Sequence, residues 1–385
     1  MVISVVDFLL FILFGIPVCY LAFFAFASVY RKPEPEPTSE TPHSFLILIP
    51  AFKEDRVILE CVDACLKQDY PKDRFDVVVI AEGMNAETLE RLGSLPIIVK
   101  NITLKKRTKA KALNKGMKDF SGYDVALVLD ADNIIEVKLL QKFNAMFNRG
   151  ATIVQGHRTA KNHNNSIALL DAMSEEINNS IFRRGHYNLG LSSALIGSGM
   201  AFRFDQFKSI MTHVDVVGGF DKELEHIYLM NKGKIHYLHH AMILDEKIQK
   251  SDHFAQQRRR WMAAQIEHLE RFFPLFMLGV RQKNIDFCDK VFQMLLLPRI
   301  LILGGVAFST ILFNTIDPGD MGHKWYYLLL LMLLALFIAI PRKLVSKKLM
   351  VALFTLPKIF VIVFLNMFKL RQANERFIHT PHGKN

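Results

Sequence analysis

The sequence predicts an α/β domain with a mostly parallel sheet, flanked on both sides by membrane-spanning helices. Three observations lead to this prediction. Short apolar segments alternate with helical patterns between residues 45 and 285, and long apolar runs lie before and after this region. The 385 residues are 51% hydrophobic and 22% charged, which excludes a disordered or collagen-like chain.

The N-terminal region, residues 1–31, is predicted to be a membrane anchor. Phe8–Tyr30 is almost uninterrupted in its apolar character and exceeds the roughly 20 residues needed to cross the hydrocarbon core. No small-residue cleavage site follows, and Arg31 and Lys32 come next. The positive-inside rule therefore places the N-terminus outside and the following residues in the cytoplasm. Residues 32–44 form a proline-rich, extended linker.

Residues 45–285 are expected to form the α/β domain at the cytoplasmic face of the membrane. Strands that alternate with helices indicate βαβ units and a mostly parallel sheet, which binds ligands beyond the carboxyl ends of its strands. The strands are predicted at Phe45–Ile49, Asp76–Ile80, Leu95–Lys100 and Val125–Leu129, and the helices at Asp55–Lys67 and Lys109–Met117.

Residues 286–370 contain the C-terminal membrane segments. Ile300–Ile316 and Trp325–Ile340 are each just long enough to span, and the basic residues 342–348 that follow belong on the cytoplasmic side. A third run, residues 349–368, carries Lys358 near its middle, where a lysine is costly in hydrocarbon. An interfacial or re-entrant segment is therefore favoured there over a complete span.

The tail, residues 371–385, is then expected to lie in the cytoplasm. Basic residues at its start support that side of the membrane.

The net charge of +11 requires a polyanionic partner or surface. The apolar runs favour an anionic membrane over nucleic acid, and no aromatic residue interleaves the basic Lys105–Lys118 run. The four cysteines are too few and too scattered for a disulfide framework: Cys19, Cys61, Cys65 and Cys288. Cys61 and Cys65 share a predicted helix face and are expected to be reduced core residues.

Two carboxylates, Asp130 and Asp132, follow directly after a predicted hydrophobic strand. Carboxylates in this arrangement suit a hard divalent cation, Mg²⁺ or Mn²⁺, together with the hydroxyl groups of a ribose. An Asp-X-Asp pair alone is also compatible with an ordinary turn after a strand. Other polar motifs accompany it, however, and most of them follow predicted strands or open predicted helices: Pro50–Glu54, Glu82–Gly83, Lys109–Asn114, Gly197–Gly199, Phe220–Glu225 and Gln257–Trp261.

This set of motifs, over roughly residues 45–270, resembles the family 2 inverting glycosyltransferases with a GT-A fold. Within them it is similar to the membrane-embedded branch that includes cellulose, chitin and hyaluronan synthases and ceramide glucosyltransferases. The resemblance implies a nucleotide-sugar donor, expected to be a UDP-sugar, and a Mg²⁺ or Mn²⁺ ion held by Asp132. It implies nucleotide-binding roles for Pro50, Ala51, Glu54, Glu82, Lys109, Asp130, Gln257 and Arg260.

The same resemblance assigns the acceptor to Trp261, Ser198 and Gly199, with the indole face as a platform for a sugar ring. Alignment of the Gly219–Leu224 segment places the general base at Asp221, and a second alignment places it at Glu223. Further residues that match family positions are assigned only to the lining of the cleft: Gln155, His157, Arg158, Asp245 and Glu246.

The tail is similar to the gating loop of cellulose synthases through Phe377 and Thr380, which would cover the bound nucleotide. The expected function is therefore inverting transfer of a hexose to a growing β-linked polysaccharide at the cytoplasmic face of the inner or plasma membrane. The alternatives are addition of a single sugar to a membrane lipid and, from another class, an inactive partner subunit. The small number of membrane segments is compatible with a lipid acceptor or with a homo-oligomer.

Overall fold

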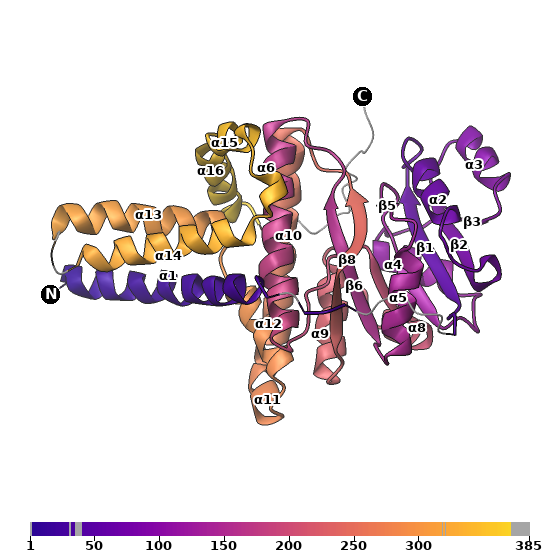
Figure 1. Ribbon diagram of the computed structural model, residues 1–385, viewed down its shortest axis with the longest axis horizontal. Coiled ribbons are helices and arrows are strands. Elements are labelled where there is room, and N and C mark those ends of the chain that lie inside the picture. Colours follow the sequence, from indigo (N-terminus) through magenta and orange to yellow (C-terminus); the bar gives the residue numbers. More distant parts are fainter. Residues whose placement is uncertain (1, 31, 35–40, 318, 320, 371–385) are drawn as a thin grey trace.

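The structure is a computed structural model that describes residues 2–30, 32–34, 41–317, 319 and 321–370. It has three parts, visible in Figure 1: an α/β domain, a layer of helices beside it, and a bundle of apolar helices that extends away from the sheet. The predicted gating residues, Phe377 and Thr380, lie outside the described residues.

The domain is built on an eight-stranded mixed sheet with the strand order β3-β2-β1-β4-β7-β6-β8-β5. Its first half is parallel, as predicted: β1 pairs with β2 and β4, and β2 pairs with β3. The bounds of these strands are Phe45–Phe52 for β1, Phe75–Glu82 for β2, Ile98–Asn101 for β3 and Val125–Val128 for β4.

The second half of the sheet introduces antiparallel pairs. β7 runs antiparallel to both β4 and β6, β6 is parallel to β8, and the two-residue β5 is antiparallel to β8. The bounds are Ile134–Ile135 for β5, Ile153–Ala160 for β6, Met200–Arg203 for β7 and Ile235–Asp245 for β8.

Two predicted boundaries differ from the observed ones. The helix expected from Asp55 begins at Ile58 instead, because Glu54 to Val57 form a turn whose amides bond back to the Glu54 carbonyl. The strand expected from Leu95 begins at Ile98, since Leu95 is still hydrogen-bonded to the preceding helix and Pro96 has no amide hydrogen to donate.

Helices cover both faces of the sheet. Alternate residues of β1 face opposite clusters: Phe45, Ile47 and Ile49 pack on one side, and Leu46 and Leu48 on the other. The first cluster includes α2 (Ile58–Leu66) and α5 (Leu139–Asn148), and the second includes α4 (Lys109–Met117), α8 (Phe204–Met211) and α9 (Phe220–Met230). A further helix, α3 (Ala86–Gly93), precedes β3.

Three of the four cysteines lie in the domain and its adjoining helices, and all four are free thiols. As predicted, Cys61 and Cys65 are fully buried on α2, within the core cluster.

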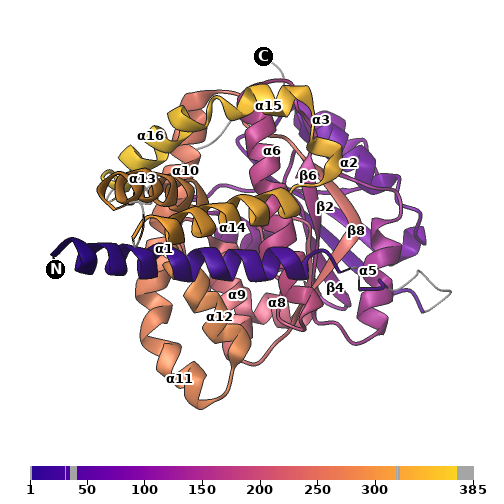
Figure 2. The same ribbon diagram turned by 60° about the vertical axis from the view of Figure 1, so that its left-hand side comes forward.

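A layer of helices separates the sheet from the apolar bundle. In Figures 1 and 2, α10 (Ser251–Phe272) runs across the direction of the bundle, and α6 lies in the same layer. The helix α6 (Ser166–Asn178) continues into a π-helical segment, Asn179–Gly185. The layer is completed by α7 (His186–Asn188), α11 (Phe276–Arg281) and α12 (Ile285–Leu295).

The apolar bundle consists of α1 (Val2–Ala27), α13 (Arg299–Ile316) and α14 (His323–Ala339), which pack together around Trp325. Among the described residues, α1 and α13 are long and apolar enough to cross a membrane, and α14 is apolar but one residue shorter than α13. This composition is consistent with membrane association.

The third C-terminal run is a bent pair of helices, α15 (Lys347–Leu353) and α16 (Leu356–Met367), with an angle of 46° between them. A pair of this shape is either a broken span or a re-entrant loop. Pro357 lies in the first turn of α16, directly after the break, where a proline is tolerated because its missing amide hydrogen is not needed.

Candidate active site

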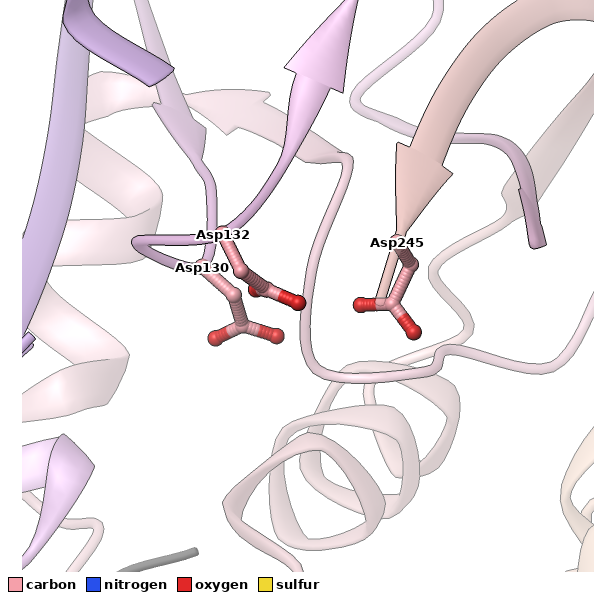
Figure 3. Close-up of side chains that lie close together, drawn as sticks. All are labelled: Asp130, Asp132 and Asp245. Carbon is pink, nitrogen blue, oxygen red and sulfur yellow. The ribbon is translucent and has the colours of Figure 1, made fainter. Parts of the chain in front are cut away.

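Three carboxylates converge at the edge of the sheet where β4 and β8 end. Asp130 and Asp132 lie in the turn after β4, and Asp245 is the last residue of β8 (Figure 3). Each offers an oxygen atom within 4.8 Å of the others. Asp130 and Asp132 were predicted as site residues, whereas the sequence assigned Asp245 only to the lining of the cleft. The sequence signal that could have indicated Asp245 is its position as a carboxylate at the end of a long strand.

Asn133, which is fully buried, holds two of these carboxylates in place. Its side-chain amide donates to Asp132 Oδ1 at 3.3 Å and to Asp245 Oδ1 at 3.1 Å. The backbone amide of Glu246 donates to Asp132 Oδ2 at 2.9 Å. The oxygen atoms are therefore fixed by neighbours before any ligand arrives, which lowers the cost of binding.

Basic side chains balance the negative charge of the cluster. Arg158 Nη1 lies 3.7 Å from both Asp130 and Asp245, and Lys247 lies 2.6 Å from Asp245. Burial opposes ionisation, yet Arg158 and Lys247 outweigh it and hold the pKa of Asp245 below its ordinary value. Glu175 on α6 pairs with both basic residues. Asp245 is thus held in its charged form. Three carboxylate oxygen atoms at this spacing fit a hard divalent cation such as Mg²⁺ or Mn²⁺.

Lys109 is placed at the cluster by the N-cap of its helix. The Thr108 hydroxyl accepts from the amide of Lys111 at 3.1 Å, so the helix begins at Lys109. The Lys109 ammonium group pairs with Asp130 and donates to the carbonyl of Gly197 at 2.7 Å. This contact joins the turn after β4 to the loop that precedes β7.

Ser198 stabilises the turn after β4 by hydrogen bonds. Its hydroxyl oxygen accepts from the amide of Asp130 at 2.9 Å, and the hydroxyl donates to Asn133. The side chain is fully buried. The neighbouring Gly199 packs against Ile243 of β8, where a Cβ atom would lie 2.9 Å from the isoleucine Cδ1. Two of the three predicted acceptor residues, Ser198 and Gly199, therefore lie near the carboxylate cluster, and Ser198 holds the turn that carries Asp130.

The two candidates for the general base have different surroundings. Asp221, in the first turn of α9, lies beside Gly197: a Cβ on that glycine would be 3.8 Å from the carboxyl carbon of Asp221. Glu223 is fully buried and pairs with two residues of α10, His268 at 3.3 Å and Arg271 at 2.6 Å. Only Asp221 is next to the loop that contacts the carboxylate cluster.

The predicted residues on β1 and β2 lie at the same edge of the sheet as the cluster. Pro50 and Ala51 pair in register with residues near the end of β2, and Glu54 lies buried in the turn that follows β1. Glu82 ends β2 and accepts from the amide of Leu104 at 3.0 Å and from Arg107 Nε at 2.9 Å. Glu82 therefore anchors the loop before α4.

The remaining predicted residues lie on α10. Gln257 Oε1 is buried and has no hydrogen-bond partner among the described residues. Arg260 is half-buried, and burial lowers the pKa of its guanidinium group. Trp261 is 46% exposed, and the guanidinium carbon of Arg258 lies 4.5 Å from the centroid of its ring. Arg258 is itself paired with Asp171 of α6. The helix thus presents a flat aromatic face to solvent, held by a cation on one side.

Comparison with known proteins identifies the family. The family model described as glycosyltransferase like family 2 matches residues 42–264, which is more than half of the chain. The probable glycosyltransferase YdaM of Bacillus subtilis is 31% identical over 97 residues, 23% of each chain. A Methanococcus voltae protein is 30% identical over 81 residues, 20% of this chain and 25% of its own. It is named dolichyl N-acetyl-alpha-D-glucosaminyl phosphate 3-beta-D-2,3-diacetamido-2,3-dideoxy-beta-D-glucuronosyltransferase. The alignments thus span about a quarter of these two relatives.

Among solved structures, the mannosyltransferase PcManGT from Pyrobaculum calidifontis, in complex with GDP-Man and Mn²⁺, is similar with a TM-score of 0.53. The sequence identity is 14%, and the match covers 87% of this chain and 96% of that one. A structural similarity at this low sequence identity shows a shared fold only. Together with the family match, it shows that the chain belongs to the family 2-like glycosyltransferases and is a glycosyltransferase with a GT-A-like fold.

Proposed function

We propose that this glycosyltransferase moves a hexose from a nucleoside-diphosphate sugar, expected to be a UDP-sugar, to an acceptor at the membrane surface, with inversion at the anomeric carbon. The observation that carries the proposal is the convergence of Asp130, Asp132 and Asp245 at the ends of their strands, with Lys109 and Arg158 beside them. The mannosyltransferase PcManGT, whose structure contains GDP-Man and Mn²⁺, has a similar fold.

The donor is assigned to the edge of the sheet. Pro50, Ala51, Glu54 and Glu82 line the nucleoside, with Asp130 at the ribose. Asp132 and Asp245 are the residues that would hold the cation, with Asn133 fixing both. When bound, Mg²⁺ or Mn²⁺ supplies positive charge to the diphosphate oxygens.

Inversion needs one group that removes the proton of the acceptor hydroxyl and others that bind the leaving diphosphate. We assign the first role to Asp221, because Glu223 is already enclosed by His268 and Arg271. Arg260 and Gln257 are assigned to the diphosphate oxygens, since a guanidinium group can bind two of them at once.

The acceptor is assigned to the exposed face of Trp261, on which a sugar ring can stack. We also assign the loop at Ser198 and Gly199 to the acceptor. This platform favours a growing β-linked polysaccharide, as in the synthase branch that the motifs resemble. The alternative is transfer of one sugar to a membrane lipid, which the few apolar helices among the described residues favour. A homo-oligomer would supply a larger membrane region for a polymer.

The experiment that tests the proposal is a donor screen with the purified full-length protein in detergent. Nucleotide release is measured for each nucleotide-sugar, with and without acceptor lipids, and the product is analysed by length. A ladder of products supports the polysaccharide, and a single lipid-linked sugar supports the alternative. No release with any donor, under conditions where the protein remains folded, would contradict the proposal and favour an inactive subunit.

We also propose the topology that follows from the charge distribution. Residues 1–31 form the anchor and 32–44 the linker, the transferase domain of residues 45–285 is cytoplasmic, and the membrane segments occupy 286–370. The tail of residues 371–385, with Phe377 and Thr380 over the nucleotide, lies inside. A single cysteine near Asn385 should resist an impermeant thiol reagent in intact cells and react after lysis. Reaction in intact cells would place the tail outside and remove the gating role.

A further inference from the structure

A cavity of about 350 Å³ lies between the catalytic domain and the helices that follow α14. Strands β6 and β8, the helix α6 and the start of α15 enclose it. We call its buried apolar residues, among them Leu169, Ala172 and Leu344, the floor, and its two exposed lysines, Lys343 and Lys348, the rim. The lining also includes polar groups: Thr159, His163, Ser346 and the carboxylate of Glu176. A cavity with an apolar floor and a cationic rim suits an amphiphile with an anionic head.

The cavity opens beside a surface that suits the edge of a bilayer. The outward face of α15 is apolar, with Met350, Val351 and Phe354 all exposed, and Phe354 is 87% exposed. The apolar helix α14 ends at Ala339, just before the lysines. Apolar side chains that face outward next to lysines are the pattern of a segment at the level of the lipid headgroups.

The two lysines at the rim have N–H donors that can bind a further acceptor. Lys343 Nζ lies 3.9 Å from the carboxylate of Glu176, at the long limit of an ion pair, and its side chain is 58% exposed. Glu176 is already engaged by His157 at 3.1 Å and by the hydroxyl of Thr159. Lys348 forms no ion pair with any residue in the described part of the chain. An ammonium group has three donors, so both lysines can bind an added anion.

We propose that this cavity binds the phosphate of an anionic phospholipid headgroup, with Lys343 and Lys348 at the phosphate and the apolar floor beneath the start of the acyl chains. Two residues that line the cavity are direct sequence neighbours of residues at the candidate active site. Thr159 follows Arg158, and Glu176 follows Glu175, two residues of the ion-pair network at the carboxylate cluster. A bound lipid therefore joins α15 to the strand and helix that support the catalytic residues.

The test compares two double variants that remove the same charge from the same loop. Binding of short-chain phosphatidylglycerol to the full-length protein in a neutral detergent is measured directly, so the result does not depend on glycosyl transfer. Lys343→Gln/Lys348→Gln should bind roughly tenfold more weakly than the control Arg342→Gln/Lys347→Gln, whose side chains lie outside the cavity. Lys343→Arg/Lys348→Arg should retain binding, and equal unfolding temperatures verify that the variants fold.

Three results would overturn the inference. An equal loss in both glutamine variants would mean a diffuse basic surface rather than a site. Equal binding of short-chain phosphatidylcholine would mean that an anionic headgroup is not what the cavity selects. Displacement of the lipid by glycerol 3-phosphate at the same concentration would mean that a soluble phosphate, and not a lipid, is the ligand.

Discussion

In the half of the sheet formed by β1 to β4, the candidate site residues follow the ends of parallel strands. In the other half they come from β8, the loop before β7, α9 and α10. The first half positions groups through the backbone register, since the carboxyl ends of parallel strands meet at one edge. The second half positions them through contacts between segments far apart in the chain, such as the ion pair of Glu223 on α9 with Arg271 on α10. The candidate residues of the first half are therefore placed by local pattern, and those of the second half by tertiary packing.

The largest expected effect tests whether the two halves share one cation. Asp132→Asn and Asp245→Asn should each lower transfer about a thousandfold, because each replaces a charged carboxylate at the cation site with a neutral amide. Chelation of the wild-type protein should abolish nucleotide release, and Mg²⁺ or Mn²⁺ should restore it. Full activity of Asp245→Asn would confine the site to the first half of the sheet.

The next effect separates the base from its neighbour on α9. Asp221→Asn should lower transfer about a hundredfold or more while donor binding, measured by calorimetry, stays nearly unchanged, because the base acts on the acceptor. Glu223→Gln should instead lower the free energy of unfolding by about 2 kcal/mol, since it removes the buried carboxylate that pairs with the half-exposed Arg271 and lies beside His268. A stable, inactive Glu223→Gln beside an active Asp221→Asn would reverse the assignment.

A pH titration probes the α9–α10 contact. His226 stacks on Phe272 of α10 with 4.5 Å between ring centroids, and burial lowers its pKa from 6.5 to about 4. The unfolded state therefore binds more protons between these two pH values. The contribution of His226 to the free energy of unfolding is fully present above pH 6.5 and is lost as the pH falls toward 4, by roughly 3 kcal/mol at most. Chemical unfolding at several pH values should show that the free energy of unfolding depends less steeply on pH in His226→Gln than in the wild-type protein. An unchanged slope would remove His226 as its source.

The smallest effect measures how closely β8 approaches the loop before β7. Gly199→Ala should lower stability by about 2 kcal/mol, because its φ is +61° and the new Cβ would lie 2.9 Å from Ile243 Cδ1. Gly190→Ala is the matched control: its φ is +78°, but its Cβ would meet open space, so only about 1 kcal/mol of backbone strain is expected. Equal losses of stability, measured by thermal unfolding, would mean that the contact with Ile243 relaxes.

Several features were predictable because their cause is local. The apolar runs of β1 and β4 predict buried strands, and a pair of carboxylates directly after β4 predicts the place of the cation. The helices α1 and α13 follow from long apolar runs, and the burial of Cys61 and Cys65 follows from their spacing on one helix face. In each case the neighbours in sequence determine the structure.

Other features depend on the order of the strands and the docking of the helices. Asp245 reaches Asp132 only because β8 pairs with β6 and β5, which brings its end to the turn after β4. Glu223 and Asp221 are two residues apart on one helix, so composition could not distinguish them; α10 encloses one and leaves the other beside Gly197. The sequence pattern could not show that Ser198 also holds Asn133 and the turn at Asp130, because these contacts join segments far apart in the chain. Sequence patterns determine which residues leave a strand, whereas long-range packing decides what each of them meets.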